Sequence, residues 1–315
     1  MDARTQGIIR SATDQHGLVA ARDVERVGLD GLGLRRAAAT GGLVRVGRGV
    51  YTHPEAWDAL DAAGRYRLRV LAAARRLRRP VFSHDAAAAL WRLPRIGPWP
   101  DQVHVLVPHA TGPGSSAVVL RHGVAAVPDH VAVVDGVRVT GVARTVLDLA
   151  RTWDLPAALA AADHALRVGW VAPSTLQDEL ASAGCGRGVG RARAVLAAAS
   201  GASESVGESL SRARMIEIGL PAPVLQHDVR DDAGLIGRVD FWWEHLGLVG
   251  EFDGRLKYRV GEVGDQRAVE DRLWQEKVRE DRLRAAGLRV VRWTWDIALD
   301  RERLARLLAS AGLRP

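Results

Sequence analysis

The sequence is poor in cysteine, methionine, lysine and aromatic residues. Its 315 residues include 1 Cys and 2 Met, and 5% are aromatic. A single cysteine, Cys185, excludes an internal disulfide framework and fits a reducing compartment. No apolar run approaches the roughly 20 residues of a membrane-spanning helix, and the N-terminus lacks a signal-peptide pattern. We therefore expect a soluble cytoplasmic protein with no membrane partner, long enough for two or three domains.

Basic residues outnumber acidic ones, and almost all of them are arginine. The 44 Lys and Arg against 37 Asp and Glu give a formal net charge of +7. This excess favours a polyanionic partner such as DNA, although a GC-rich coding bias would also raise the arginine content. Lys257 and Lys277 are the only lysines. Because an ammonium can lose its proton or orient a water where a guanidinium cannot, these two positions are candidates for a specialised role.

Segments of alternating polar and apolar residues flank residues 244–247 and predict a β-hairpin. If the first and last residues of that turn face each other, Asp240 lies opposite Glu251, and Arg238 opposite Asp253. Directly opposed carboxylates are destabilising unless a cation neutralises them. Carboxylate oxygens are ligands that Mg²⁺ takes, so the pair predicts a metal site. The alternative is an exposed hairpin whose acids are screened by Arg238 and water.

Residues 1–55 predict a winged helix-turn-helix domain. Three helices are followed by a two-stranded wing that turns at Gly47, and the expected ranges are 6–15, 18–28, 32–40 and, for the wing, 43–51. Such a fold is typical of DNA-binding proteins. The alternative is a three-helix structural or protein-binding module.

Four arginines are the DNA-binding candidates of this domain. The third helix would offer Arg35 and Arg36 to the major groove, and the wing would place Arg45 and Arg48 near phosphates. Arginine suits both roles because its planar fork can hold two acceptors at once.

Residues 56–199 mix helices with short strands and carry no strong catalytic pattern. We expect helices at 62–77 and 143–150 and strands at 103–108, 118–121 and 137–140. Ser83, His84 and Asp85 are adjacent and cannot converge as a hydrolytic triad, so Ser83 is expected to cap a helix. Further histidines lack metal-ligand spacing and are expected to be ordinary strand or loop residues; these are His104, His109, His122 and His130.

Three motifs of this middle region and two of the N-terminal one resemble known proteins. Asp23-Val24 and the run Gly-Leu-Val-Arg-Val-Gly-Arg-Gly-Val-Tyr, with Pro54 after it, resemble the N-terminal domain of the AbiEi type IV antitoxin family. The segments Ser-His-Asp-Ala-Ala-Ala-Ala-Leu, Val-Thr-Gly-Val-Ala-Arg-Thr-Val-Leu-Asp-Leu and Ala-Asp-His-Ala-Leu are similar to the second domain of that family. The resemblance implies regulation or partner binding, with a toxin or another protein as partner, and not a reaction.

A predicted linker at 197–203 leads into a final α/β unit, to which we assign residues 200–315. Its expected elements are a helix at 204–218, a strand at 224–229, the hairpin, a helix at 266–286, a strand at 288–293 and a helix at 301–309. The order is therefore α-β-β-β-α-β-α.

This order resembles the PD-(D/E)XK nuclease superfamily, and within it the very-short-patch-repair-endonuclease-like proteins. The match rests on Glu208 in the first helix, Asp240 in the second strand and Glu251-Phe-Asp253-Gly in the third, and it covers about residues 200–297. It implies a restriction-endonuclease-like core and hydrolysis of DNA phosphodiester bonds with Mg²⁺ or Mn²⁺. Asp240 and Glu251 would hold the metal, and Glu208 would bind a metal-bound water or complete the shell.

One position departs from the superfamily pattern. Its lysine belongs two residues after Glu251, where this chain has Asp253. An aspartate can add a ligand, but it cannot stabilise an anionic transition state as a cation does. Lys277 is therefore the candidate for a relocated lysine, and Lys257 is the second choice.

Two of these residues also have structural explanations. Glu208 stands three residues after Ser205, the spacing of a helix capping box. Lys277 stands four residues before Asp281, the spacing of an ion pair on an exposed helix face. Taken together with Asp240 and Glu251 of the hairpin, Glu208 and Lys277 favour a metal-dependent catalytic site over these structural explanations.

The sequence thus predicts an α/β protein with domains at 1–55, 56–199 and 200–315. Its first predicted function is that of a DNA-binding protein with a Mg²⁺-dependent endonuclease domain, acting in defence, repair or mobile-element control. The alternative is a non-catalytic antitoxin or transcriptional repressor that retains a degenerate nuclease fold. The DNA sequence, the strand preference and the oligomeric state stay open.

Overall fold

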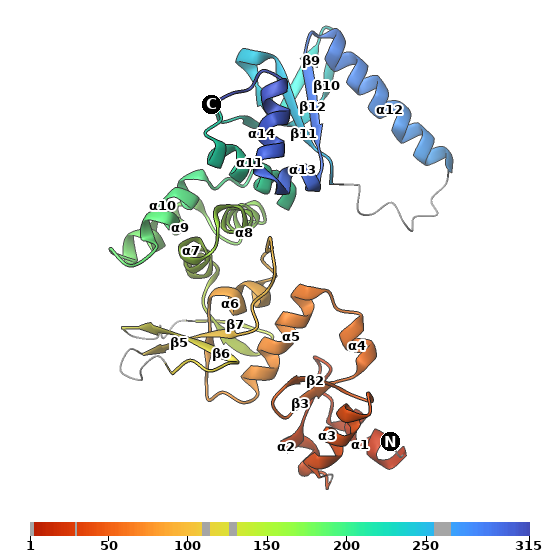
Figure 1. Cartoon of the computed structure of the whole chain (residues 1–315), viewed down its shortest axis with the longest axis vertical. Coiled ribbons are helices and arrows are strands. Elements are labelled where there is room, and N and C mark those ends of the chain that lie inside the picture. Colours follow the sequence, from red (N-terminus) through yellow and green to blue (C-terminus); the bar gives the residue numbers. More distant parts are fainter. Residues whose placement is uncertain (1–2, 29, 109–113, 126–130, 255–265) are drawn as a thin grey trace. The chain divides into compact units, whose positions relative to one another are not determined.

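The computed structural model describes residues 3–28, 30–108, 114–125, 131–254 and 266–315, with the side chains of 3, 4 and 266–273 outside this description. The chain forms two compact units, Met1–Leu149 and Ala150–Pro315 (Figure 1). Helices and sheets alternate in both units, so the predicted mixed α/β class is confirmed at that level. In the described residues, none of the helices combines the length and the apolar character needed to cross a membrane.

The first unit begins with three helices and a small sheet. The elements are α1 (Ala3–Ala12), β1 (Leu18–Ala20), α2 (Ala21–Glu25), α3 (Gly31–Ala39), β2 (Val44–Gly47) and β3 (Val50–Thr52). The sheet order is β1-β3-β2, with antiparallel neighbours.

One prediction for this region is wrong, because Leu18–Ala20 form a strand and not the start of the second helix. Leu18 and Ala20 pack into a core shared with the following long helix, whereas Val19 packs into the core of the first three helices. Successive residues of a strand face opposite sides, so a strand can bury all three against two layers.

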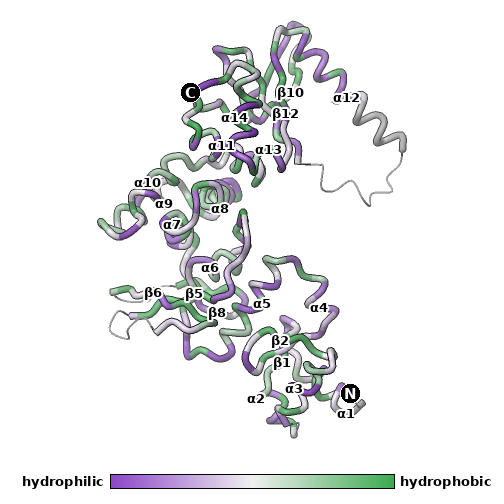
Figure 2. The backbone as a smooth tube through the Cα atoms, in the orientation of Figure 1, coloured by the Kyte–Doolittle hydropathy of each residue, from purple (hydrophilic) through white to green (hydrophobic). Residues whose placement is uncertain are grey.

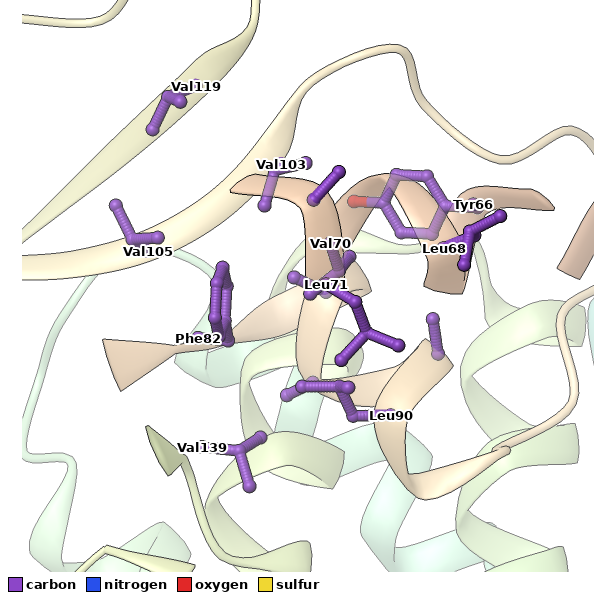
Figure 3. Close-up of a cluster of buried hydrophobic side chains, with 14 of the residues drawn as sticks. Tyr66, Leu68, Val70, Leu71, Phe82, Leu90, Val103, Val105, Val119 and Val139 are labelled. Carbon is purple, nitrogen blue, oxygen red and sulfur yellow. The ribbon is translucent and has the colours of Figure 1, made fainter. Parts of the chain in front are cut away.

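The rest of the first unit is a five-stranded sheet with flanking helices. Its elements are α4 (Pro54–Asp58), α5 (Ala62–Ala74), β4 (Val81–Phe82), α6 (His84–Trp91), β5 (Val103–Pro108), β6 (Val119–Val124), β7 (Ala132–Val134), β8 (Val137–Val139) and α7 (Val142–Thr152), with strand order β6-β5-β4-β8-β7. The predicted helices and strands are present. Tyr66, Leu71, Phe82, Leu90 and Val103 are among the side chains that fill the core (Figure 3).

The second unit starts with a helical layer. It contains α8 (Leu155–Arg167), α9 (Pro173–Ser182), α10 (Val189–Ala198) and α11 (Val206–Ile218), and α8 packs along α11. The predicted linker at 197–203 is tied into this layer, because the Ser200 N–H donates to Asp163 Oδ1 at 2.7 Å and Ser203 is buried.

A four-stranded sheet completes the unit. The elements are β9 (Val224–Asp231), β10 (Gly234–Trp243), β11 (Leu248–Phe252), α12 (Gln266–Ala285), β12 (Arg289–Trp293), α13 (Trp295–Leu299) and α14 (Arg301–Ser310), with strand order β12-β11-β10-β9. Only β11 and β12 run parallel. The part of α12 coloured in Figure 2 is largely hydrophilic, whereas the sheet carries long apolar stretches. The short helix α13 was not predicted.

The hairpin has the predicted register. Phe241 pairs with Gly250, Trp242 with Val249 and Trp243 with Leu248. The Gly247 N–H donates to the Glu244 carbonyl at 3.0 Å, so the ends of the turn face each other as predicted, around a short 3-10 helix. Alternation determined this register, since a one-residue slip would turn the buried aromatic side chains to the wrong face.

Candidate functional site

The structure brings together the predicted site acids of the second unit. Glu208 lies on α11, Asp240 on β10 and Glu251 on β11. The Gln226 side-chain amide donates to Glu208 Oε2 at 2.9 Å and to Asp240 Oδ1 at 3.3 Å. Asp240 Oδ2 accepts the backbone N–H of Phe252 at 2.8 Å, which fixes the carboxylate beside the end of β11.

Gln226 was not assigned a role from the sequence. It occupies β9 between Leu225, which pairs with Phe241, and His227, which pairs with Val239. Its φ of 52° is rare for a residue with a side chain and costs about 1–3 kcal/mol, a strain that persists where the surroundings impose it and often marks functional sites. The strained residue is the one whose side-chain amide bridges Glu208 and Asp240. The sequence around Gln226 does not by itself indicate this bridging position.

Glu208 has the capping contacts that the sequence offered as its structural explanation, and it also lies beside Asp240. Ser205 is the N-cap of α11, and its hydroxyl accepts the Glu208 N–H at 3.2 Å. Glu208 Oε2 accepts the Glu204 N–H at 2.8 Å in addition to Gln226. Glu208 therefore stabilises the helix start, a structural task, while its carboxylate remains buried beside Asp240.

Glu251 is held by two arginines that the sequence analysis did not single out. Its Oε2 accepts from Arg292 Nε at 2.7 Å, and its Oε1 pairs with Arg279 of α12. Glu276 also contacts both guanidinium groups, Arg279 Nη1 at 3.1 Å and Arg292 Nη2 at 2.5 Å. These residues are far apart in the sequence, so only the packing of α12 and β12 reveals the network.

Of the two candidate replacement cations, Lys277 lies within the described residues. In the described part of α12, Arg279 pairs with Glu251, whereas the exposed Lys277 places its Nζ 5.8 Å from the ring centroid of Trp274. Lys257 lies outside the described residues. Asp253 follows β11, and its backbone N–H donates to the Trp293 carbonyl at 2.8 Å.

The surroundings of Asp240 disfavour the charged form of its carboxyl group. Burial raises its pKa to about 6, and the charges of Glu208 and Glu251 act in the same direction. Glu208 and Asp240 fit a hard divalent cation, because carboxylate oxygens are its preferred ligands and its charge would relieve this repulsion. Glu251 fits less well, since each of its oxygens already accepts from an arginine.

We expect Asp240→Asn to raise stability at neutral pH. An acid whose pKa is raised on folding binds more protons in the folded state between about pH 4 and 6, so the wild type loses stability as pH rises through this window. The variant lacks this loss. Its thermal midpoint should exceed that of the wild type at pH 8, and the gap should close below about pH 4. Asp228→Asn, which alters an exposed acid on β9, is the control and should follow the wild type.

The DNA-binding candidates of the first unit are all exposed. Arg35 and Arg36 lie on α3 beside the buried Leu34 and Ala37, so the apolar face of the helix packs inward and its arginines face solvent. Arg45 lies on β2 and Arg48 in the turn before β3, and both are exposed.

The comparisons with known proteins concern the region between these two groups. Residues 85–198 match the model of the AbiEi antitoxin C-terminal domain. This AbiEi-like region runs from α6 to the end of α10, so the match ends before Glu208. The antitoxin-like part of the sequence resemblance is thereby supported.

The relatives are two uncharacterized proteins of Mycobacterium tuberculosis, MT2308 of strain CDC 1551 / Oshkosh and Rv2248 of strain ATCC 25618 / H37Rv. Each is 37% identical over 128 residues, which is 41% of this chain and 47% of the relative. The chain thus spans about half the length of the curated relatives it matches. The crystal structure of the RV2827C protein from Mycobacterium tuberculosis aligns over 72% of this chain and 87% of that chain, with 18% identity and a TM-score of 0.38.

Proposed function

We propose that the protein is a DNA-binding regulator of the antitoxin type. The observation that carries this proposal is the match of residues 85–198 to the AbiEi antitoxin C-terminal domain. In this proposal residues 1–55 form a winged helix-turn-helix, with α3 as the recognition helix and the β2–β3 hairpin as the wing. The order α1-β1-α2-α3-β2-β3 supports it.

The charges of the first unit are compatible with this role. Arg35 and Arg36 point to solvent from the helix that would enter the major groove, and Arg45 and Arg48 point to solvent from the wing. Contacts to phosphate position such a domain, whereas contacts of a guanidinium fork to base edges select the sequence. The net charge of +7 adds long-range attraction to DNA. A toxin or another protein is the second proposed partner, through the AbiEi-like region.

We expect the double substitution Arg35→Ala/Arg36→Ala to weaken DNA binding at least about tenfold, since each bidentate base contact contributes roughly 1–3 kcal/mol of discrimination. The probe is duplex DNA from upstream of the protein's own coding region, and the competitor is unrelated duplex of equal length. The slope of log affinity against log salt should also become shallower.

The matched control is Arg306→Ala, which removes an exposed arginine of α14 in the other unit. It should bind like the wild type. Equal affinity of the wild type for both DNAs, or no effect of the α3 substitutions, would contradict the recognition-helix assignment.

A second candidate function is that of a metal-dependent endonuclease, in a PD-(D/E)XK-like core at 200–315. The cluster of the buried Glu208 with the half-buried Gln226 and Asp240, in which the pKa of Asp240 is raised, favours it. Glu208 and Asp240 would hold Mg²⁺ or Mn²⁺, and Glu251 would join them only by releasing an arginine. A bound ion of this kind polarises a phosphate and lowers the pKa of a bound water. Among the described residues, Arg279 and Arg292 are cations that pair with Glu251.

The Asp240→Asn variant separates the two functions. If the cluster binds a cation, Mg²⁺ should raise the thermal midpoint of the wild type more than that of the variant. Incubation with supercoiled, linear and single-stranded DNA, with Mg²⁺, Mn²⁺ or EDTA, then tests cleavage. Cutting that requires metal and Asp240 would establish a nuclease. DNA binding without any metal-induced shift of the thermal midpoint would leave the regulator as the one remaining function of the two.

A further inference from the structure

Three histidines of the first unit gather at one point, contrary to the expectation that they are ordinary strand or loop residues. His84 begins α6, His104 lies in β5 and His122 lies in β6. One side-chain nitrogen from each lies within 4.8 Å of the other two. His109 and His130, which the sequence grouped with them, lie outside the described residues.

Strand pairing explains how the sheet brings two of them together. β5 and β6 run parallel, with His104 paired to Leu120 and Leu106 paired to His122. Residues two apart on a strand share a face, so His104 and His122 are diagonal neighbours on one side of the sheet. His84 arrives from the end of β4, where the Ser83 N–H donates to the His104 carbonyl at 3.1 Å.

The distances between these side chains suit a shared metal ion. His122 Nε2 lies 3.3 Å from His104 Nδ1. Nitrogens bound to one tetrahedral zinc ion, at about 2.0–2.1 Å each, are separated by roughly 3.3 Å. The rings of His84 and His122 are stacked with centroids 3.6 Å apart, so His84 would have to turn out of this stack for its nitrogen to share an ion with the other two.

Burial disfavours the charged form of two of these imidazoles. It lowers the pKa of His104 and of His122 to about 4, with Arg95 contributing for the first and His104 for the second. The neutral imidazole is the form that binds a metal. His84 and His104 are each only 8% exposed, so both side chains are buried and do not simply face solvent.

Polar side chains stand beside two of the rings. Ser83 Oγ lies 3.0 Å and Asp148 Oδ2 3.8 Å from His84 Nδ1, so these groups face one nitrogen of the ring and leave Nε2 for a metal. Asp85 Oδ2 lies 3.4 Å from His104 Nδ1, the same nitrogen that faces His122 Nε2, so this carboxylate lies at the proposed site itself. Ser83 occupies the predicted N-cap position, yet its hydroxyl contacts His84 and makes no capping hydrogen bond. His84 also has a φ of 49°, a backbone strain that often marks functional positions.

We propose that His84, His104 and His122 bind one divalent transition-metal ion of the zinc type. Imidazole nitrogens select zinc and its neighbours over Mg²⁺, which prefers oxygen. Three protein ligands leave one coordination position for water, and Ser83, whose hydroxyl lies 3.0 Å from His84 Nδ1, acts as a positioning residue through His84. The ion would tie α6 to β5 and β6. This inference is independent of the proposed DNA-binding function and of the acids around Asp240.

The test uses the full chain, stripped with EDTA, dialysed and titrated with Zn²⁺ by calorimetry. We expect one Zn²⁺ per chain and a raised thermal midpoint, since binding to the folded state alone stabilises it. His104→Gln and His122→Gln should each weaken binding by at least about tenfold, and Ser83→Ala by about 10–100-fold. His245→Gln, which replaces an exposed histidine of the hairpin turn, should bind Zn²⁺ like the wild type.

A second measurement needs no variant. Co²⁺ added to the stripped wild type should give the intense visible absorption of a four-coordinate site, and Zn²⁺ should bleach it. Absence of this absorption, or equal Zn²⁺ affinity in the wild type and in folded His104→Gln, would overturn the proposal and leave the three histidines as a packed polar cluster.

Discussion

Replacing Asp163 with alanine is expected to destabilise the Ala150–Pro315 unit by about 3–5 kcal/mol. Asp163 lies on α8 with its side chain 1% exposed, and it pairs with Arg212 of α11 at 2.7 Å. Arg212 is itself 11% exposed, so the substitution would leave a buried guanidinium without its carboxylate. Removing one partner of such a pair costs far more than the pair contributes, because the remaining charge was desolvated on folding.

Asp163 also accepts two neutral donors, which adds to the loss. Its Oδ1 accepts the Ser200 N–H at 2.7 Å, and its Oδ2 accepts the Ser209 hydroxyl at 2.8 Å. One side chain thus connects α8, the segment before α11 and α11 itself. Each buried donor left without an acceptor costs about 1–3 kcal/mol.

Denaturant unfolding of the full chain, followed by tryptophan fluorescence, measures this effect. Glu302→Ala is the matched control, because it removes the acid of an ion pair whose partners are 77% and 70% exposed. Exposed pairs contribute about 0–1 kcal/mol, so this variant should unfold near the wild-type midpoint. Similar midpoints for the two variants would show that the buried pair does not hold the helical layer. The double variant Asp163→Ala/Arg212→Met should recover part of the lost stability, since it also removes the guanidinium that Asp163→Ala leaves unpaired.

Gly207→Ala is expected to destabilise the same unit by about 1–3 kcal/mol, the usual range for overpacking. A Cβ at position 207 would lie 1.9 Å from Cε1 of Phe252. The Phe252 ring packs edge-on against Trp295 with ring centroids 5.2 Å apart, so moving it away would disturb this contact. Its backbone N–H holds Asp240, and a displaced Phe252 would therefore disturb the acid cluster as well.

Gly190 offers a matched comparison for this substitution. Both glycines follow a valine at the start of a helix, Val206-Gly207 in α11 and Val189-Gly190 in α10. A Cβ on Gly190 meets nothing within 4 Å. Gly190→Ala should leave stability unchanged or raise it by up to about 0.5–1 kcal/mol, as alanine is the better helix former. Equal effects at the two sites would contradict the close approach at Gly207.

A rescue variant isolates the contact responsible. Phe252→Ala removes the ring that the new methyl group would meet, so the cost of Gly207→Ala should shrink in that background. Residues in contact typically show coupling of about 0.5–3 kcal/mol in such a cycle. Additive losses would place the strain elsewhere.

The sequence by itself determined the elements whose causes are local. The helices at 62–74 and 266–285 and the strands at 103–108 and 289–293 follow from periodicity, and the register of Phe241 with Gly250 follows from alternation that buries one face. Ser205 caps α11 because its hydroxyl reaches an N–H three residues ahead. Asp240 and Glu251 were identified because alternation in the hairpin places both on one face, and Glu208 was identified through the resemblance to the nuclease superfamily.

Only the tertiary structure decided features that depend on contacts between distant segments. Leu18–Ala20 became a strand because two apolar layers meet there, which no window of the sequence around it reveals. Arg279 and Arg292 reach Glu251 because α12 and β12 pack beside β11. The histidines at 84, 104 and 122 meet because parallel pairing of β5 and β6 aligns residues far apart in the chain. The sequence states which side-chain chemistry is present, but which groups share a site depends on how the strands pair and how the helices pack on the sheets.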